Sequence, residues 1–260
     1  MLKILKYSFY DLMRSRWSYV YFFFYLLIGF VLLFLNNDTS KAVITLMNII
    51  VILTPLIGTI FGVMYYYNSR EFTELLLAQP LKRSTLFLGQ YIGVSVSLSL
   101  SLVLGLGIPF LAYGVTQSSA IFDFISLLFV GVFLTFIFVA LAFNIALSNE
   151  NKIKGFGYAI LLWLFMAVIY DGIFLISLIV FKDYPLDQFS LFATIFNPID
   201  LSRIVVLLKL DISALLGYTG AVFQKFFGSN FGMLVSNATL LLWVILPTLR
   251  IVFKSKKKDF

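Results

Sequence analysis

The chain has 260 residues, of which 61% are apolar and 12% are charged, against ~45–50% and ~25% in ordinary globular proteins. It contains no cysteine and no histidine, which excludes disulfides, thiolate metal sites and serine–histidine or HExxH chemistry. The net charge of +7 could suit a nucleic acid, but the basic residues lie at the borders of long apolar runs. We therefore expect a membrane protein with no nucleic-acid partner.

Residues 1–16 are expected to form an interfacial elbow helix. Leu5 and Leu12 fall on one face of such a helix, whereas Lys3 and Lys6 lie largely elsewhere. This amphipathic pattern is typical of a helix that lies along the membrane surface.

The rest of the chain predicts an all-α, polytopic permease domain, residues 1–260, with six transmembrane helices. A helix that crosses the bilayer needs ~20 apolar residues, and the long runs without Asp, Glu, Lys or Arg meet this length. The predicted spans are residues 17–35, 43–67, 86–115, 121–147, 156–181 and 231–252.

The basic residues predict the orientation of these spans. Fourteen of the 19 Lys and Arg residues lie on one side of the predicted membrane, and the other five are Lys41, Lys182, Arg203, Lys209 and Lys225. Because cytoplasmic loops carry the excess of basic residues, both termini are expected to be cytoplasmic.

Residues 68–84, between the second and third spans, are more than a loop. Leucines at 75, 76 and 77 make the segment apolar, Glu71 and Glu74 keep it from crossing the membrane, and Pro80 interrupts its helix. We expect a short amphipathic cytoplasmic helix that suits contact with a soluble partner.

This segment resembles the coupling region of type-2 ABC exporter permeases. The shared pattern is R-E-x-T-E-L-L-L-A-Q-P-L-x-R-x-x-x-x-L-G, although this chain has Gln90 where the family has Lys and Phe72 where Gly is common. The resemblance implies a separate cytoplasmic ABC ATPase that binds ATP and Mg, and no cofactor, metal or catalytic residue in this chain. The residues it assigns to ATPase coupling are Arg70, Glu71, Thr73, Glu74, Leu75, Leu76, Leu77, Pro80 and Arg83.

Within this family the chain is most similar to the NosY-type permeases, which serve nitrous oxide reductase maturation. Besides Glu74–Arg83, the segment N-P-x-D-x-x-R at Asn197, Pro198, Asp200 and Arg203 carries this similarity. It implies a bacterial inner-membrane location, a periplasmic β-helical partner, and delivery of copper or sulfur species or transmission of force to that partner. Because there are six spans and one coupling region per chain, two copies are expected to form the pore.

The outer segment, residues 182–230, predicts short helices at the outer leaflet. Asp200 and Arg203 are three residues apart and could form an exposed ion pair, which would add little stability. The segment could dock a periplasmic protein, act as a gate, or cover the helix bundle as a lid. Apolar residues 214–216 belong to the same prediction.

Asp171 is the acidic residue that lies well inside a predicted span. Acids within the membrane are costly and are functional candidates by default, so Asp171 is a pore candidate. The alternative is a wetter site near the outer leaflet where Asp171 has a local partner.

Two other functions remain open at this point. The chain could be an export permease for another cargo, such as a lipid-linked glycan or a drug, with the same coupling region. An intramembrane enzyme or a passive scaffold is a more distant alternative, because an enzyme needs a cluster of titratable groups and a scaffold does not explain residues 68–84.

Overall fold

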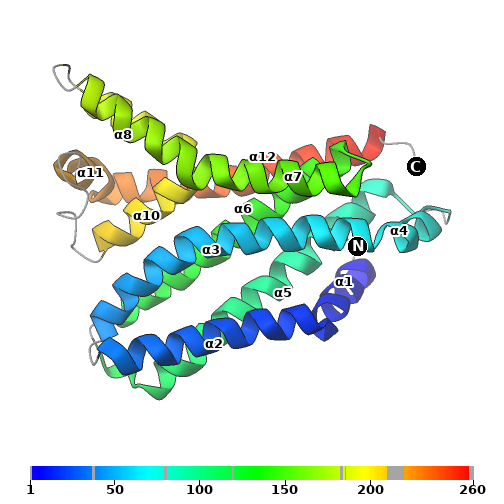
Figure 1. Ribbon diagram of the computed structural model, residues 1–260, viewed down its shortest axis with the longest axis horizontal. Helices are drawn as coiled ribbons and strands as arrows, with labels where there is room; N and C mark the ends of the chain where they lie inside the picture. The colour runs from blue at the N-terminus through cyan, green and yellow to red at the C-terminus, as the bar shows by residue number, and fades with distance from the viewer. Residues whose placement is uncertain are drawn as a thin grey trace.

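The computed structural model describes residues 2–36, 39–78, 81–118, 120–181, 184, 186–209 and 220–257, and these ranges contain helices and no strands. Figure 1 shows a bundle of long helices with shorter helices at both ends. The elements are α1 (Leu2–Arg14), α2 (Arg16–Asn36), α3 (Thr39–Asn68), α4 (Arg70–Leu77), α5 (Arg83–Ala112), the 3-10 helix η1 (Val115–Gln117), α6 (Ile121–Ser148), α7 (Lys152–Leu164), the π-helix η2 (Phe165–Ile169), α8 (Tyr170–Val180), α9 (Asp187–Phe196), α10 (Pro198–Lys209), α11 (Gly220–Phe227) and α12 (Asn230–Lys257).

Six helical stretches are long and apolar enough to cross a membrane, as the sequence predicts. They are α2, α3, α5, α6, the α7–η2–α8 stretch and α12. The fifth begins at Lys152, earlier than the predicted residue 156, because Asn151 caps it. Its side-chain oxygen accepts hydrogen bonds from the amides of Ile153 at 2.9 Å and Lys154 at 3.2 Å, which satisfies two free N–H groups of the first turn.

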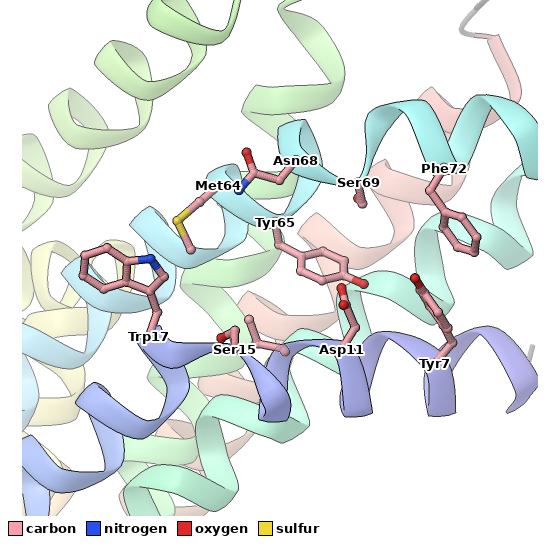
Figure 2. A pocket seen from close by; sticks show the side chains of 10 residues that line it. Tyr7, Asp11, Ser15, Trp17, Met64, Tyr65, Asn68, Ser69 and Phe72 are labelled. Carbon is pink, nitrogen blue, oxygen red and sulfur yellow. The ribbon is translucent and has the colours of Figure 1, made fainter.

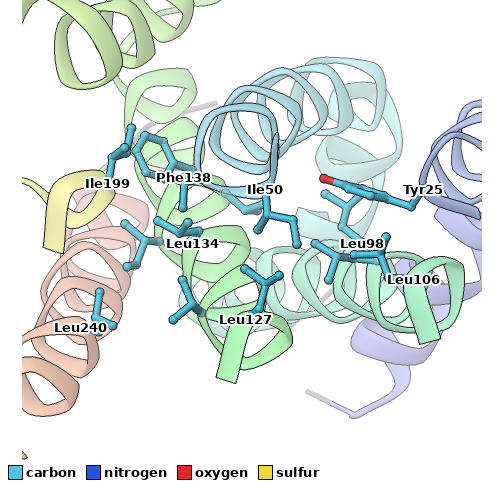
Figure 3. Packing of buried hydrophobic residues seen from close by; sticks show 14 of the residues in the cluster. Tyr25, Ile50, Leu98, Leu106, Leu127, Leu134, Phe138, Ile199 and Leu240 are labelled. Carbon is cyan, nitrogen blue, oxygen red and sulfur yellow. The ribbon is translucent and has the colours of Figure 1, made fainter. Parts of the chain in front are cut away.

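Helices α5 and α6 form the centre of the bundle. Helix α5 contacts α1, α2, α3, α6 and α12. Because neighbouring helices cover it on several sides, serines on several of its faces are all buried. Figure 3 shows the apolar packing between these helices, with Ile50 of α3 facing Leu127 and Leu134 of α6. Within this core the hydroxyl of Tyr25 lies 2.8 Å from that of Thr54, so α2 and α3 also share a buried hydrogen bond.

The two ends of the bundle carry different short elements. Helices α1 and α4 lie at the end where α12 finishes, which we call the terminal end, and α10 and α11 lie at the opposite or far end (Figure 1). At the terminal end, Tyr67 donates to the carbonyl of Asn149 at 2.7 Å and Lys152 donates to the side chain of Asn68 at 3.0 Å. These bonds hold the end of α3 against the α6–α7 connection.

Candidate functional site

The predicted helix within residues 68–84 is α4, an eight-residue helix. Its first turn is held by Thr73, whose amide and hydroxyl both donate to the carbonyl of Ser69, at 2.8 and 2.7 Å. Arg70 pairs with Glu74 one turn later at 2.8 Å, and this carboxylate raises the pKa of Arg70 above its ordinary value. Of the predicted coupling residues, Pro80 lies outside the described residues, and Arg83 begins α5.

Helix α4 has an inner and an outer face. Thr73 is buried, and Leu76 and Leu77 are partly buried and pack against the core of the bundle. On the outer face Leu75 is 71% exposed, and Glu71 and Glu74 are exposed as well. The helix therefore presents an apolar side chain among carboxylates while its other face is anchored.

Two contacts attach α4 to other helices of the bundle. The ring of Phe72 stacks on Tyr7 of α1, with centroids 4.6 Å apart and an angle of 25° between the planes. The side-chain amide of Gln90, in the second turn of α5, donates to the hydroxyl of Thr73 at 2.8 Å. A displacement of α4 would therefore be passed to both α1 and α5.

Sequence reasoning did not identify Gln90 as a site residue. It is 2% exposed, and it occupies the position where the resembling family has lysine. The glutamine at position 90, where the family has lysine, was the available signal for a buried contact. A neutral amide donor suits a buried partner such as a threonine hydroxyl better than an ammonium group does.

Gln90→Met keeps the length of the side chain and removes the donor, so it is expected to lower the free energy of unfolding by about 1 kcal/mol. The measurement is a double-mutant cycle with Thr73→Val in thermal or denaturant unfolding, and we expect a coupling energy of about 1 kcal/mol. Strictly additive effects would show that this hydrogen bond does not hold α4.

At the far end, the structure brings together the two groups of residues that the sequence assigned separately to a pore and to an outer segment. The guanidinium of Arg203 lies 3.1 Å from Asp171 Oδ2 and 3.5 Å from Asp200 Oδ1. The predicted local pairing of Asp200 with Arg203 is confirmed, but the expectation that it is exposed is wrong. Side-chain exposure is 11% for Asp200 and 23% for Arg203, because α10 packs between α3, α6 and α12.

Helices α9 and α10 meet at a bend of 114°, so the outer segment contains a broken span or re-entrant pair. Pro198 begins α10, where its missing N–H costs no helical hydrogen bond. Asn197 caps the helix through its side-chain oxygen, which accepts from the amide of Ile199 at 3.0 Å. The predicted short helix at residues 204–208 is thus confirmed as part of α10, and α9 is an additional helix that the sequence did not predict, whereas residues 214–216 lie outside the described ranges.

The same asparagine connects this bend to the fifth span. Its amide donates to Asp200 Oδ2 at 2.7 Å and to the carbonyl of Met166 at 2.8 Å. Met166 belongs to the π-helix η2, where the regular hydrogen-bond ladder is interrupted. The buried side chain of Asn197 therefore binds the fifth span at its π-helical turn.

The last carbonyls of α9 also receive donors from other spans. Tyr170 donates to the carbonyl of Ala193 at 2.7 Å, and the indole of Trp243 donates to that of Ile195 at 3.1 Å. These carbonyls would otherwise be unsatisfied at a helix end inside an apolar bundle. Asn197, Tyr170 and Trp243 together fix the bend, a role that no local motif indicated.

Among the described residues, no three His, Cys, Asp or Glu side chains are grouped closely enough to hold a metal ion. The far-end cluster is an ion-pair network of two carboxylates and one guanidinium. Through Arg203 and Asp171 this network links α10 to α8.

Comparison with protein-family models and with curated protein sequences gives no match for this chain.

Proposed function

We propose that this chain is the membrane permease of an ABC exporter of the type-2 class, driven by a separate ATPase. The observation that carries the proposal is α4, a short helix whose outer face is exposed and whose inner face is bonded to α1 and α5. A docking element needs an accessible face, and a coupling element needs a firm connection to the parts that move. Helix α4 meets both requirements.

The positive charges place the terminal end in the cytoplasm in this proposal. Closure of the ATPase around ATP pushes on α4, and Phe72 and Thr73 pass that displacement to α1 and α5. Because α5 packs on α6, and α6 contacts α10, the movement can reach the far end. There the bond between Arg203 and Asp171 is the contact between α8 and α10 that changes between the two states.

A single chain supplies six spans, so we place two copies around the pore, in the bacterial inner membrane. The NosY-like similarity makes nitrous oxide reductase maturation the favoured process, with a periplasmic β-helical protein at the far end. A chain without cysteine or histidine suits a sulfur species or transmitted force better than tight binding of copper.

The test is capture of the partner ABC ATPase that the proposal requires, with a Glu71→Arg, Leu75→Asp double variant. We expect roughly 100-fold weaker binding, because an exposed leucine at the centre of an interface contributes about 1.5–3 kcal/mol and a buried aspartate adds a further cost. Leu77 is a poorer choice for this test, since it packs against the core and its substitution would also perturb the fold.

Ile153→Asp is the control for the leucine substitution, since Ile153 is 82% exposed at the start of α7 and an apolar side chain is again replaced by aspartate. We expect it to leave ATPase capture intact. Equal capture by all three proteins would refute the coupling role of α4. A different outcome concerns the cargo. If the unchanged chain captures the ATPase and the double variant does not, but deletion of the gene for this chain leaves reductase maturation unaffected, the permease class stands and the NosY-like role is refuted.

A further inference from the structure

A pocket of about 370 Å³ lies at the terminal end between α1, the start of α2, α3 and α4. Figure 2 shows Asp11 of α1 pointing up into it beside the hydroxyl end of Tyr65, which descends from α3. Trp17 lies on one side of these two residues, and Tyr7 and Phe72 lie on the other. A carboxylate thus stands between two aromatic walls.

The lining has a marked chemical bias. Its ten residues include one acid, four aromatic rings and neither lysine nor arginine. The stack of Tyr7 on Phe72 holds two of these rings in place, with centroids 4.6 Å apart. Aromatic faces carry negative charge density and attract cations within about 6 Å, and the carboxylate adds a full negative charge.

We propose that this pocket binds an organic cation, an ammonium group that carries small alkyl substituents. An anion would meet a carboxylate and neither lysine nor arginine among the lining residues, and a neutral apolar molecule would bring no positive charge to Asp11. A bare metal ion would find a single carboxylate, too few strong ligands for a stable site. A substituted ammonium matches the charge of Asp11 and the four aromatic side chains that line the pocket.

The position of the pocket limits the size and source of the cation. Its volume is at the lower end of the range for small-molecule sites, which suits a group of headgroup size. It also lies where spans α2 and α3 end, at Arg16 and Asn68, the level at which lipid headgroups meet protein. The ammonium can therefore come from a choline or ethanolamine lipid or from a free amine, and the proposal holds whichever partner docks on α4.

The test measures binding of radiolabelled choline to the full chain in nanodiscs that contain phosphatidylglycerol alone. We expect saturable binding, at least about tenfold tighter than that of the uncharged analogue in which carbon replaces the nitrogen. Asp11→Asn is expected to weaken choline binding about tenfold, and Tyr7→Leu, which removes one ring of the wall, about threefold.

Glu150→Gln is the matched control, because it removes a carboxylate that is exposed at the same end but does not line the pocket. It is expected to bind choline as the unchanged chain does. Asp11 is exposed, so we expect its replacement by asparagine to leave the fold intact. Unfolding curves of Asp11→Asn and Glu150→Gln check this.

A second arm identifies the source of the cation by mass spectrometry of lipids retained after purification from a mixed bilayer. Retention of choline or ethanolamine lipids that depends on Asp11 assigns a lipid headgroup, and choline binding without such retention assigns a free amine. The proposal is overturned if the unchanged chain shows neither, or if Asp11→Asn and Glu150→Gln have equal effects.

Discussion

Replacing Arg203 with methionine is expected to destabilise the protein by roughly 3 kcal/mol. The guanidinium is the shared counter-charge of Asp171 and Asp200, at 3.1 and 3.5 Å. Methionine fills much of the same space without charge, so the two carboxylates would repel each other across the α8–α10 contact. The side chains are 11–32% exposed, which places the effect at the lower end of the range for buried ion pairs.

The charge explanation makes a second, sharper prediction. The triple variant Arg203→Met, Asp171→Asn, Asp200→Asn removes all three charges, keeps the shapes of the two acidic side chains and fills much of the space of the arginine. Its free energy of unfolding is therefore expected to lie within about 1 kcal/mol of that of the unchanged chain. Thermal unfolding in detergent with tryptophan fluorescence measures both variants. If the triple variant is as unstable as Arg203→Met, packing of the arginine stem and not its charge holds α10.

The triple variant also separates stability from the proposed gate. If the chain serves the proposed maturation of nitrous oxide reductase, a triple variant that has regained stability but no longer supports it would show that the ion pair acts in the proposed transport cycle. Full function would reduce Asp171 to a structural partner of Arg203. In both cases the triple variant is stably folded, so a loss of function cannot be attributed to unfolding.

The spans and α4 were predictable because their signals are local. Bilayer length selects long uncharged runs, and the charges that flank them mark their ends. In residues 68–84, Glu71 and Glu74 precede three consecutive leucines at 75, 76 and 77, which gives an amphipathic helix of about two turns. The proline that predicted the break, Pro80, lies outside the described residues, so that part of the prediction is untested.

The far-end site was not predictable because its contacts join residues distant in sequence. Asp171 and Arg203 are brought together by the bend between α9 and α10, and Asn197 depends on a π-helix at Phe165–Ile169 that has no marked sequence signature. Apolar residues such as Ile199 are equally suited to lipid and to protein, so hydropathy cannot show that α10 inserts among α3, α6 and α12.

The attachment of α1 could be only half predicted for the same reason. Its amphipathic pattern predicted a helix along the membrane surface, but the surface of α5 that receives it includes two glycines four residues apart, Gly89 and Gly93. A Cβ built on Gly89 would lie 2.9 Å from the side chain of Ile4, and one on Gly93 would lie 2.7 Å from Cβ of Ser8. Small residues at this spacing let two helix backbones approach closely.

Gly93→Leu is therefore expected to displace α1 from α5. Its Cβ would also lie 3.0 Å from the carbonyl oxygen of Leu5 and 3.1 Å from the amide nitrogen of Phe9, and these backbone atoms cannot move unless the helix moves. We expect the free energy of unfolding to fall by about 3 kcal/mol, the upper end of the range for overpacked cores, because the whole of α1 must shift. Displacement of α1 would also separate Tyr7 from Phe72 and so remove one of the two connections to α4.

The absence of native cysteine provides a direct measurement of this displacement. Ser8→Cys places a single thiol at a position that is 1% exposed, so maleimide labelling should be slow in the native bundle. Adding Gly93→Leu is expected to speed labelling at least about tenfold, since the thiol reacts once α1 opens. Gly107→Leu is the matched control on the same helix, where an added Cβ meets nothing within 4 Å. Labelling that stays slow with Gly93→Leu, or that rises equally with Gly107→Leu, would show that the close approach at Gly93 does not hold α1 in place.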